Sequence, residues 1–228
     1  MPFYKHCTQN KTKQDATKRI IAYWNKRVEV FGEEKAMLPM TLDLALDVDA
    51  DKKALEIAYS RITFQKDDAG RGIIFVDPSR LPEKGMYERK SMMKAFWYTM
   101  HAILEDEEIQ RKGVVILAHP KHAAQSNFDR KLTKMNIESL RGCIPVRVAA
   151  IHICNPPWFF ELFFPILKLF LGEKMRKRIK LHSGEDEEVL EKMQDKFGIS
   201  REKIPTEMGG GLVLDHMKWL EGRRSQGL

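Results

Sequence analysis

The residues of this chain that could do chemistry are few and form no familiar catalytic pattern. His119 and His122 make a His-x-x-His pair after an apolar segment, but no Asp, Glu or Cys lies at the spacing of a third metal ligand. His152 and Cys154 would share one face of a strand, where a cysteine usually serves as a small buried hydrophobe. We therefore predict loop histidines, a buried cysteine, no metal and no catalysis. An enzyme that uses these four residues ranks third, after the two non-catalytic hypotheses given at the end of this section.

Two other functional motifs are missing from the sequence. No Gly-x-Ser-x-Gly turn is present, which a hydrolase of the α/β class uses to expose its nucleophile. The three glycines at 209–211 lead into Leu-Val-Leu-Asp, whereas a phosphate-binding loop continues with Lys and Ser or Thr. We interpret these glycines as a tight backbone passage and expect no nucleotide site.

The most informative segment, residues 157–171, reads PWFFELFFPILKLFL and carries charge only at Glu161 and Lys168. A helix made from it is apolar nearly all round, and Pro165 kinks or divides that helix. The segment is too short to span a bilayer, which takes about 20 apolar residues. Two interpretations stay open: a helix buried on every side, or one whose second face meets a lipid inside the protein or at a membrane.

A basic run follows directly, in which Glu173 is the one acid among five cations: Lys174, Arg176, Lys177, Arg178 and Lys180. An aromatic, apolar helix joined to such a run suits an anionic membrane surface, where each cation contributes about 1 kcal/mol. A core helix beside a solvated charge run is the alternative. Nucleic acid is not expected as a partner, because its binding surfaces interleave aromatic and basic residues.

Composition supports a globular protein. Hydrophobic residues make up 43% and charged residues 31% of the 228, and the net charge of +7 favours an anionic partner. The first residues lack the apolar core of a secretory signal, and Cys7, Cys143 and Cys154 suit neither a disulfide framework nor a zinc site. We expect a cytoplasmic monomer that is peripheral at membranes.

Periodicity predicts the elements that must position these residues. An amphipathic helix over 12–31 and two short helices form an N-terminal helical region, residues 1–58. Strands and helices then alternate, which predicts an α/β fold with a mainly parallel sheet and flanking helices. The predicted strands are 59–64 and 72–76, an antiparallel pair, then 114–118, 146–153 and 179–182; the predicted helices are 91–104, 127–140, one ending at 197, and 215–223.

Three segments carry a more specific pattern. They are PVRVAAIHICNPP at 145–157, FLGEKMRKRI at 170–179 and IPTEMGG at 204–210, with an Asp-x-x-Gly-Arg turn at 67–71. In order and spacing they resemble the CRAL-TRIO family of lipid-binding domains. The resemblance covers residues 59–228, which we expect to form the lipid-binding domain.

The resemblance implies a sheet floor and helical walls around an apolar pocket for one lipid, closed by a gate helix at 157–171. Pro165 and Gly172 are the hinge positions that it implies. The bound lipid is the only small molecule expected, and no other cofactor is. The residues expected to form the pocket and its gate are Trp158, Phe160, Phe163, Phe164, Leu167, Phe170, Phe96 and Met100.

Family members that bind phosphatidylinositol carry an acid directly after the proline at 145 and a lysine at 178, where this chain has Val146 and Arg178. The resemblance therefore does not extend to inositol capture inside the pocket. Other members bind membrane phosphoinositides through surface cations, and Arg147, Lys174 and Arg178 match those positions; an ion pair at the sheet edge is the alternative for Arg147.

Together these features predict a non-catalytic protein that binds a hydrophobic lipid and carries or presents it at anionic membranes, including those with phosphoinositides. The rival hypothesis is an interaction module on the same fold. In that case the helix at 157–171 is permanently buried and the basic run docks a protein.

Overall fold

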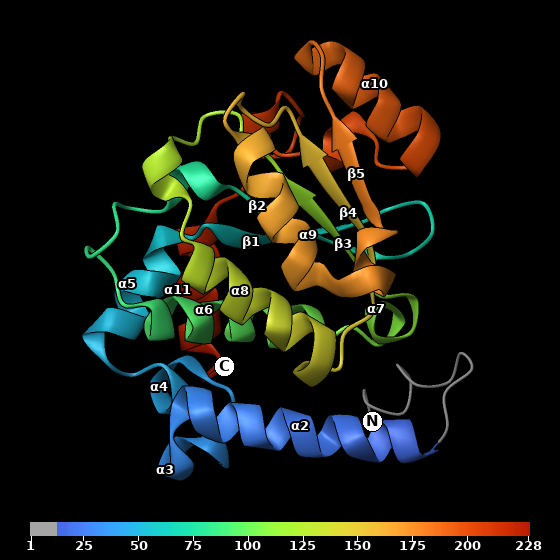
Figure 1. The fold of residues 1–228 in the computed structure, drawn as a ribbon. Helices are drawn as coiled ribbons and strands as arrows, with labels where there is room; N and C mark the ends of the chain where they lie inside the picture. The colour runs from blue at the N-terminus through green and yellow to red at the C-terminus, as the bar shows by residue number, and fades with distance from the viewer. Residues whose placement is uncertain (1–12) are drawn as a thin grey trace.

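A computed structural model of the chain describes residues 13–228, and its centre is a sheet of five strands in chain order (Figure 1). The first two strands are antiparallel and the other neighbours are parallel, which confirms the predicted α/β fold. The strands are β1 (Ser60–Lys66), β2 (Gly72–Val76), β3 (Val114–Ala118), β4 (Val148–Cys154) and β5 (Ile179–His182).

Both faces of the sheet are buried, because the central strands are apolar at successive positions. Ile74, Ile116 and Ile151 point to one face and join the larger hydrophobic core. Their neighbours point to the other face, where they pack against α10 (Asp186–Phe197) and the segment after it. The period of two residues along each strand thus separates two layers, and the site described below lies in only one of them.

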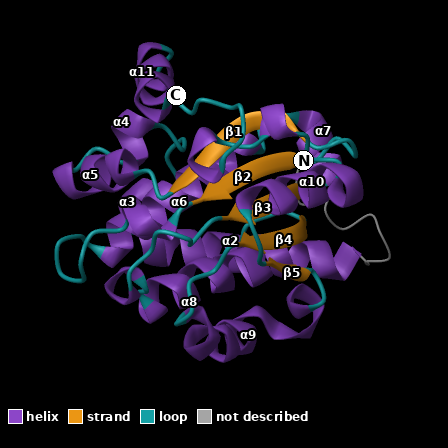
Figure 2. Cartoon of the chain, turned by 90° about the horizontal axis from the view of Figure 1, so that it is seen from above, coloured by secondary structure: helices purple, strands orange, loops and turns teal. Residues whose placement is uncertain are grey.

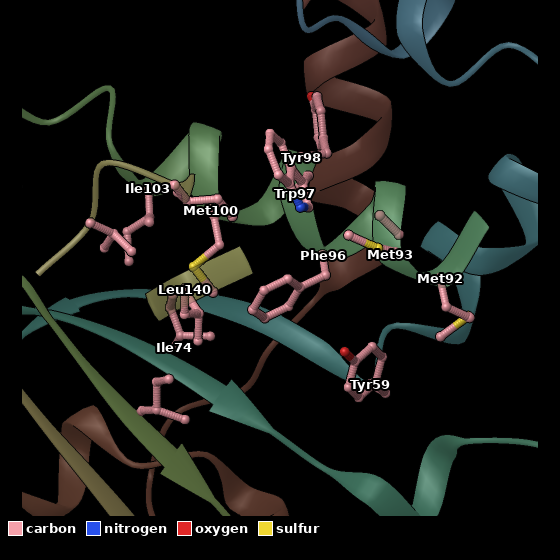
Figure 3. Packing of buried hydrophobic residues seen from close by; sticks show 14 of the residues in the cluster. Tyr59, Ile74, Met92, Met93, Phe96, Trp97, Tyr98, Met100, Ile103 and Leu140 are labelled. Carbon is pink, nitrogen blue, oxygen red and sulfur yellow. The ribbon is translucent and has the colours of Figure 1, made fainter. Parts of the chain in front are cut away.

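The helix α6 (Arg89–Ile103) is the centre of the larger core and is buried at every position from Ser91 to Met100. Phe96 and Met100 lie on the side of Ile74 and Leu140, while Trp97 and Tyr98 lie on the opposite side (Figure 3). This helix therefore separates the sheet layer from the helices at the N-terminus.

In the described part of the chain four helices precede the sheet: α2 (Lys13–Phe31), α3 (Glu33–Ala36), α4 (Leu42–Ala45) and α5 (Asp49–Ile57). In Figure 1, α2 runs beneath α6 and α8, and Tyr23 stacks on Trp97 with 5.5 Å between ring centroids. Tyr23 and Val30 lie on the buried face of α2, whereas Ile21 is 56% exposed. Cys7 and the predicted helix start at residue 12 lie outside the described residues.

The other helices are α7 (Glu107–Lys112), α8 (Arg130–Glu138), α9 (Phe160–Arg176) and α11 (His216–Ser225). The α8 helix begins later than predicted because the Asp129 carboxylate accepts the backbone N–H groups of Lys131 and Leu132 and so caps it. In Figure 2, α8 and α9 lie together on one side of the molecule and α11 on the far side of the sheet. No helix within residues 13–228 is long and apolar enough to cross a membrane.

Candidate functional site

The helix α9 consists of two helical pieces. Gly172 interrupts it with φ +67° and ψ 167°, a conformation that is essentially restricted to glycine. Pro165 lies inside the first piece on its exposed side, so the helix divides at Gly172 and not at this proline, which removes the N–H that would bond the Glu161 carbonyl oxygen. The helix follows β4 directly, so it starts beside the carboxyl ends of the parallel strands and runs back across the sheet (Figure 1).

One face of α9 is turned inward. Phe160, Leu167, Leu171 and Met175 recur at helical spacing and line a hollow between α9, α8 and the sheet. The hollow has a volume of about 180 Å³. Its floor is formed by β-strand side chains, its far wall by α8, and the complete lining is Tyr59, Val76, Pro78, Leu81, Phe96, Ile116, Ala118, Pro120, Asn127, Phe128, Thr133, Asn136, Ile137, Leu140, Ile151, Ile153, Phe160, Leu167, Leu171 and Met175.

The predicted pocket residues occupy several different places. Phe96, Phe160 and Leu167 line the hollow itself. Phe163 and Phe170 line a side pocket of about 30 Å³, which shares Phe128, Thr133, Phe160 and Leu167 with the hollow.

The other three predicted residues lie outside both cavities. Phe164 packs on the core beside Phe160, with 5.6 Å between their ring centroids. Met100 is fully buried in the core, and Trp158 is 82% exposed. The structure thus brings five of the eight predicted residues together in the hollow and its side pocket, and it places Trp158 on the outer surface.

The outer side of α9, together with the turn before it, also carries apolar side chains. Trp158 in the turn and Leu162 and Leu169 on the helix are 82%, 62% and 69% exposed, and exposed Pro165 lies between them at helical spacing, next to the exposed charged residues Glu161 and Lys168. We call these four residues the outer stripe. Apolar side chains on both sides of one helix agree with the second interpretation of the segment, in which its two faces meet different apolar surroundings.

The inner side of α9 is fastened by an aromatic contact. The Phe163 ring stacks on the Phe128 ring at 4.7 Å between centroids and 8° between planes, and the Arg130 guanidinium lies 5.4 Å from the Phe163 ring. Phe163 is only 9% exposed. We call the Phe128–Phe163 pair the latch.

The predicted phosphate-binding residues do lie together. Arg147, Lys174 and Arg178 line a cleft of about 420 Å³ at the C-terminal end of α9, which we call the cationic cleft. Burial, and then the neighbouring Arg147, lower the pKa of the Arg178 guanidinium from its usual value. Within residues 13–228 no carboxylate forms an ion pair with any of the three. The ion pair at the sheet edge that was the alternative for Arg147 is therefore not formed with these residues.

Two further cations of the cleft were missed by sequence reasoning. Arg19 reaches it from α2 and donates to the Ile144 carbonyl oxygen at 2.6 Å, and Arg141 donates to the Phe170 carbonyl oxygen at 2.6 Å. Both residues are distant in sequence from the basic run, so only the tertiary structure brings them there. Leu171 and Met175 line both cavities, which makes the cleft and the hollow neighbours.

Two neutral polar residues of the hollow were also missed. Tyr59, just before β1, and Asn136, on α8, are each 8% exposed, and the Asn136 Nδ2 amide donates a hydrogen bond to the Tyr59 hydroxyl. In the sequence Asn136 reads as one more polar position of an amphipathic helix. The signal that could have found it is its place one residue before Ile137 and four before Leu140, on the buried side of that helix.

The residues considered for catalysis lie elsewhere. His152 and Cys154 point to the α10 side of the sheet, where His152 Nδ1 lies 2.9 Å from His182 Nε2. Burial, and then the neighbouring His182, lower the pKa of His152 to about 3, and burial raises the pKa of Cys154 to about 12. His119 is buried and His122 exposed, and no three His, Cys, Asp or Glu side chains in the described part of the chain form a metal site.

Comparison with known proteins decides the family. A family model described as the CRAL/TRIO domain matches residues 59–210. The chain belongs to the CRAL/TRIO family. This confirms the resemblance carried by the three motifs, and the family is one of lipid-binding domains.

The most similar curated relatives include clavesins. Clavesin-1 of Xenopus laevis is 25% identical over 187 residues, which are 81% of this chain and 54% of that protein. Clavesin-2 of Homo sapiens is 28% identical over 164 residues, which are 71% of this chain and 48% of that protein. The chain therefore spans about half the length of these CRAL/TRIO relatives.

Among solved structures, that of Sfh5 has the same fold. The superposition gives a TM-score of 0.53 at 15% identity and covers 98% of this chain and 86% of the Sfh5 chain. Because the superposition covers nearly the whole chain, the N-terminal helices are part of the shared architecture together with the CRAL/TRIO domain.

Proposed function

We propose that this protein binds one hydrophobic lipid in the hollow and carries or presents it at anionic membranes, with α9 as the gate. The observation that carries the proposal is the position of α9, which closes an apolar hollow with one face and exposes the apolar outer stripe with the other. A soluble helix gains nothing from exposing Trp158, Leu162 and Leu169 to water, whereas at a bilayer these side chains enter the interface.

The size of the hollow requires α9 to move. Its volume of about 180 Å³ is below the about 300–1,000 Å³ of pockets that hold drug-sized ligands, so a whole lipid enters only when α9 moves outward. The wall of the hollow formed by α9 is the one that can open, because this helix is interrupted at Gly172 and can swing outward from there. A lipid gains about 0.8 kcal/mol per buried methylene whether it lies in the hollow or in the bilayer, so the free energy of its transfer between the two is close to zero. The opening of α9 then limits the rate of exchange.

The cationic cleft orients the protein on the membrane. Its five cations lie at the Gly172 end of α9, beside the wall that it shares with the hollow. Guanidinium groups suit phosphate oxygens because they donate two parallel hydrogen bonds. We propose that the cleft holds an anionic head group of the membrane, including phosphoinositides, while the outer stripe enters the bilayer.

The proposal contains no catalytic step. His152 and Cys154 are separated from the hollow by the sheet, and the Cys154 thiol is held neutral by burial. The function follows from binding, gating and membrane contact alone.

Mass spectrometry of lipids extracted from the purified protein tests the proposal. We expect a hydrophobic molecule at near-stoichiometric amount, and its loss from Ala118→Phe, which fills the hollow from β3. Leu162→Ala, on the outer stripe, is the matched control and keeps the molecule. An empty wild-type protein that also moves no lipid between vesicles contradicts the proposal.

The interaction module remains the second candidate, and the small hollow is the observation that favours it. In that case α9 never opens, and the cationic cleft docks an acidic protein surface. Lipid content in the wild-type protein separates the two candidates directly.

A further inference from the structure

The hollow is lined by uncharged side chains. Within residues 13–228 its lining includes no Asp, Glu, Lys, Arg or His, and the cation Arg130 belongs to the side pocket. A phosphate or carboxylate inside it would lose its hydration without a counter-ion, and an unpaired buried charge is strongly unfavourable. The five cations nearby face the separate cationic cleft instead.

The hollow does contain one buried polar pair, Tyr59 and Asn136. Asn136 Nδ2 donates to the Tyr59 hydroxyl oxygen, while Asn136 Oδ1 is buried and has no hydrogen-bond partner among residues 13–228. The Tyr59 hydroxyl accepts this bond and keeps its own proton for another acceptor. Burial raises the pKa of Tyr59, so the phenol is neutral.

The pair therefore offers one donor and one acceptor to a ligand. Exchanging the oxygen and nitrogen of the Asn136 amide does not change this, because Tyr59 would then donate to Oδ1, leaving its own lone pair and the Nδ2 protons available. The other polar lining residues differ. Asn127 uses both ends of its amide, accepting from the Ala124 N–H and donating to the Leu81 carbonyl oxygen, and Thr133 is only half-buried.

We propose that Tyr59 and Asn136 select an uncharged lipid that carries a hydroxyl group on an apolar body. The ligand hydroxyl donates to Asn136 Oδ1 and accepts from the Tyr59 hydroxyl, which satisfies both members of the pair at once. This inference rests on the proposed function, since it names the ligand class of the same hollow. Recognition is then divided: the neutral lipid binds inside, and anionic head groups bind only in the cationic cleft.

Such a site discriminates between ligands mainly by the polar groups of Tyr59 and Asn136 that a wrong ligand leaves without hydrogen-bond partners. An alkane as long as the alcohol fills the hollow but leaves the Asn136 oxygen without a partner. A fatty acid anion whose carboxylate lies at the pair brings a charge that no lining residue of the hollow compensates, since Arg130 lines only the side pocket. The preference therefore depends on the pair itself and disappears when both residues become apolar.

The test uses displacement of the neutral fluorescent probe N-phenyl-1-naphthylamine by 1-decanol, decane and decanoate. For the wild-type protein we expect 1-decanol to displace the probe and decanoate to be the weaker of the two. The double variant Tyr59→Phe, Asn136→Leu replaces both partners by apolar groups of similar shape, a change that is often nearly neutral for folding. It should lower the affinity for 1-decanol about tenfold and leave decane unchanged or tighter.

Thr133→Val is the matched control, and its affinity for 1-decanol should equal that of the wild type. Thermal unfolding verifies that each variant is folded, and the single variant Tyr59→Phe replaces the double variant if the latter is not. Equal loss of 1-decanol and decane, no change for 1-decanol, or tighter binding of decanoate overturns the inference and leaves the lipid hollow standing. If neither the probe nor any of the three compounds binds, the proposed function itself fails.

Discussion

Truncation of Phe163 to alanine separates a moving gate from a fixed core helix. Phe163 is buried in the latch against Phe128, yet it lies outside the lining of the hollow. The variant therefore removes contacts that hold α9 closed and leaves the contacts of a ligand in the hollow in place. Leu162→Ala is the matched control, because the neighbouring side chain is 62% exposed on the outer stripe.

The size of the effect follows from the contacts of the latch. Burying a phenylalanine side chain contributes about 1.5–3 kcal/mol, and a stacked aromatic pair adds about 0.5–1.5 kcal/mol. Since an open α9 would not have these contacts, truncation favours opening by about 3 kcal/mol, or about a hundredfold in the opening equilibrium. If part of the latch survives in the transition state, the opening rate rises by about ten- to a hundredfold.

Stopped-flow exchange of a fluorescent fatty alcohol measures this rate. A gate shifted toward opening accelerates both binding and release, whereas a merely enlarged side pocket slows release without accelerating binding. Hydrogen exchange in α9 should become faster as well, while α10, on the other face of the sheet, keeps its protection. Exchange rates equal to those of Leu162→Ala in a folded Phe163→Ala protein would refute the gating argument.

Three further predictions concern the cleft, the bend and the sheet. Lys174→Glu should weaken binding to acidic vesicles at least fivefold at low salt, from about 1 kcal/mol per cation, while Lys196→Glu on the opposite side should not; equal effects would make the cleft a bystander. Gly172→Ala should destabilise closed α9 by about 1–3 kcal/mol, because φ is +67° there and an added Cβ would lie 3.0 Å from a guanidinium; unchanged hydrogen exchange around the bend would contradict this. His152 and His182 are neutral when folded, with pKa values of about 3 and 4. Below pH 6.5 the unfolded chain binds protons that the folded chain does not, so each of these two histidines should make urea unfolding easier by about 2 kcal/mol from pH 7 to pH 5, and His101 and His216, whose pKa values burial lowers to about 4, add to the effect. His152→Gln should reduce this pH dependence by about 2 kcal/mol; an unchanged profile in that variant would show that His152 is not a cause.

The sheet was the most predictable part of the fold. The run 114–118 is apolar throughout and lies between Gly113 and His119, and the strand β3 has the same limits. The start of α8 was less predictable, because the Asp129 cap competes with a helical pattern that extends further in both directions. The buried face of α2 depends on the packing of Tyr23 on Trp97 of α6, a tertiary contact that periodicity does not contain.

For the site, the sequence predicted the apolar character of α9 and three of the cations, but not which face each residue would join. Trp158 and Phe160 look alike in the sequence, yet one is exposed and the other lines the hollow. Arg19 reaches the cleft from α2, and its backbone acceptor, the Ile144 carbonyl oxygen, lies 125 positions further along the chain. The Tyr59–Asn136 pair joins residues separated by 77 positions, so its chemistry exists only in the folded chain.

The most direct measurement for the whole account is photo-cross-linking with a long-chain alcohol that carries a diazirine, followed by peptide mass spectrometry. We expect adducts on the floor of the hollow and on the inner face of α9, at residues such as Ile116, Ile151 and Leu167, and competition by unlabelled 1-decanol. Adducts confined to Trp158, Leu162 and Leu169, or none that 1-decanol displaces, would contradict the claim that a lipid enters the hollow beneath α9.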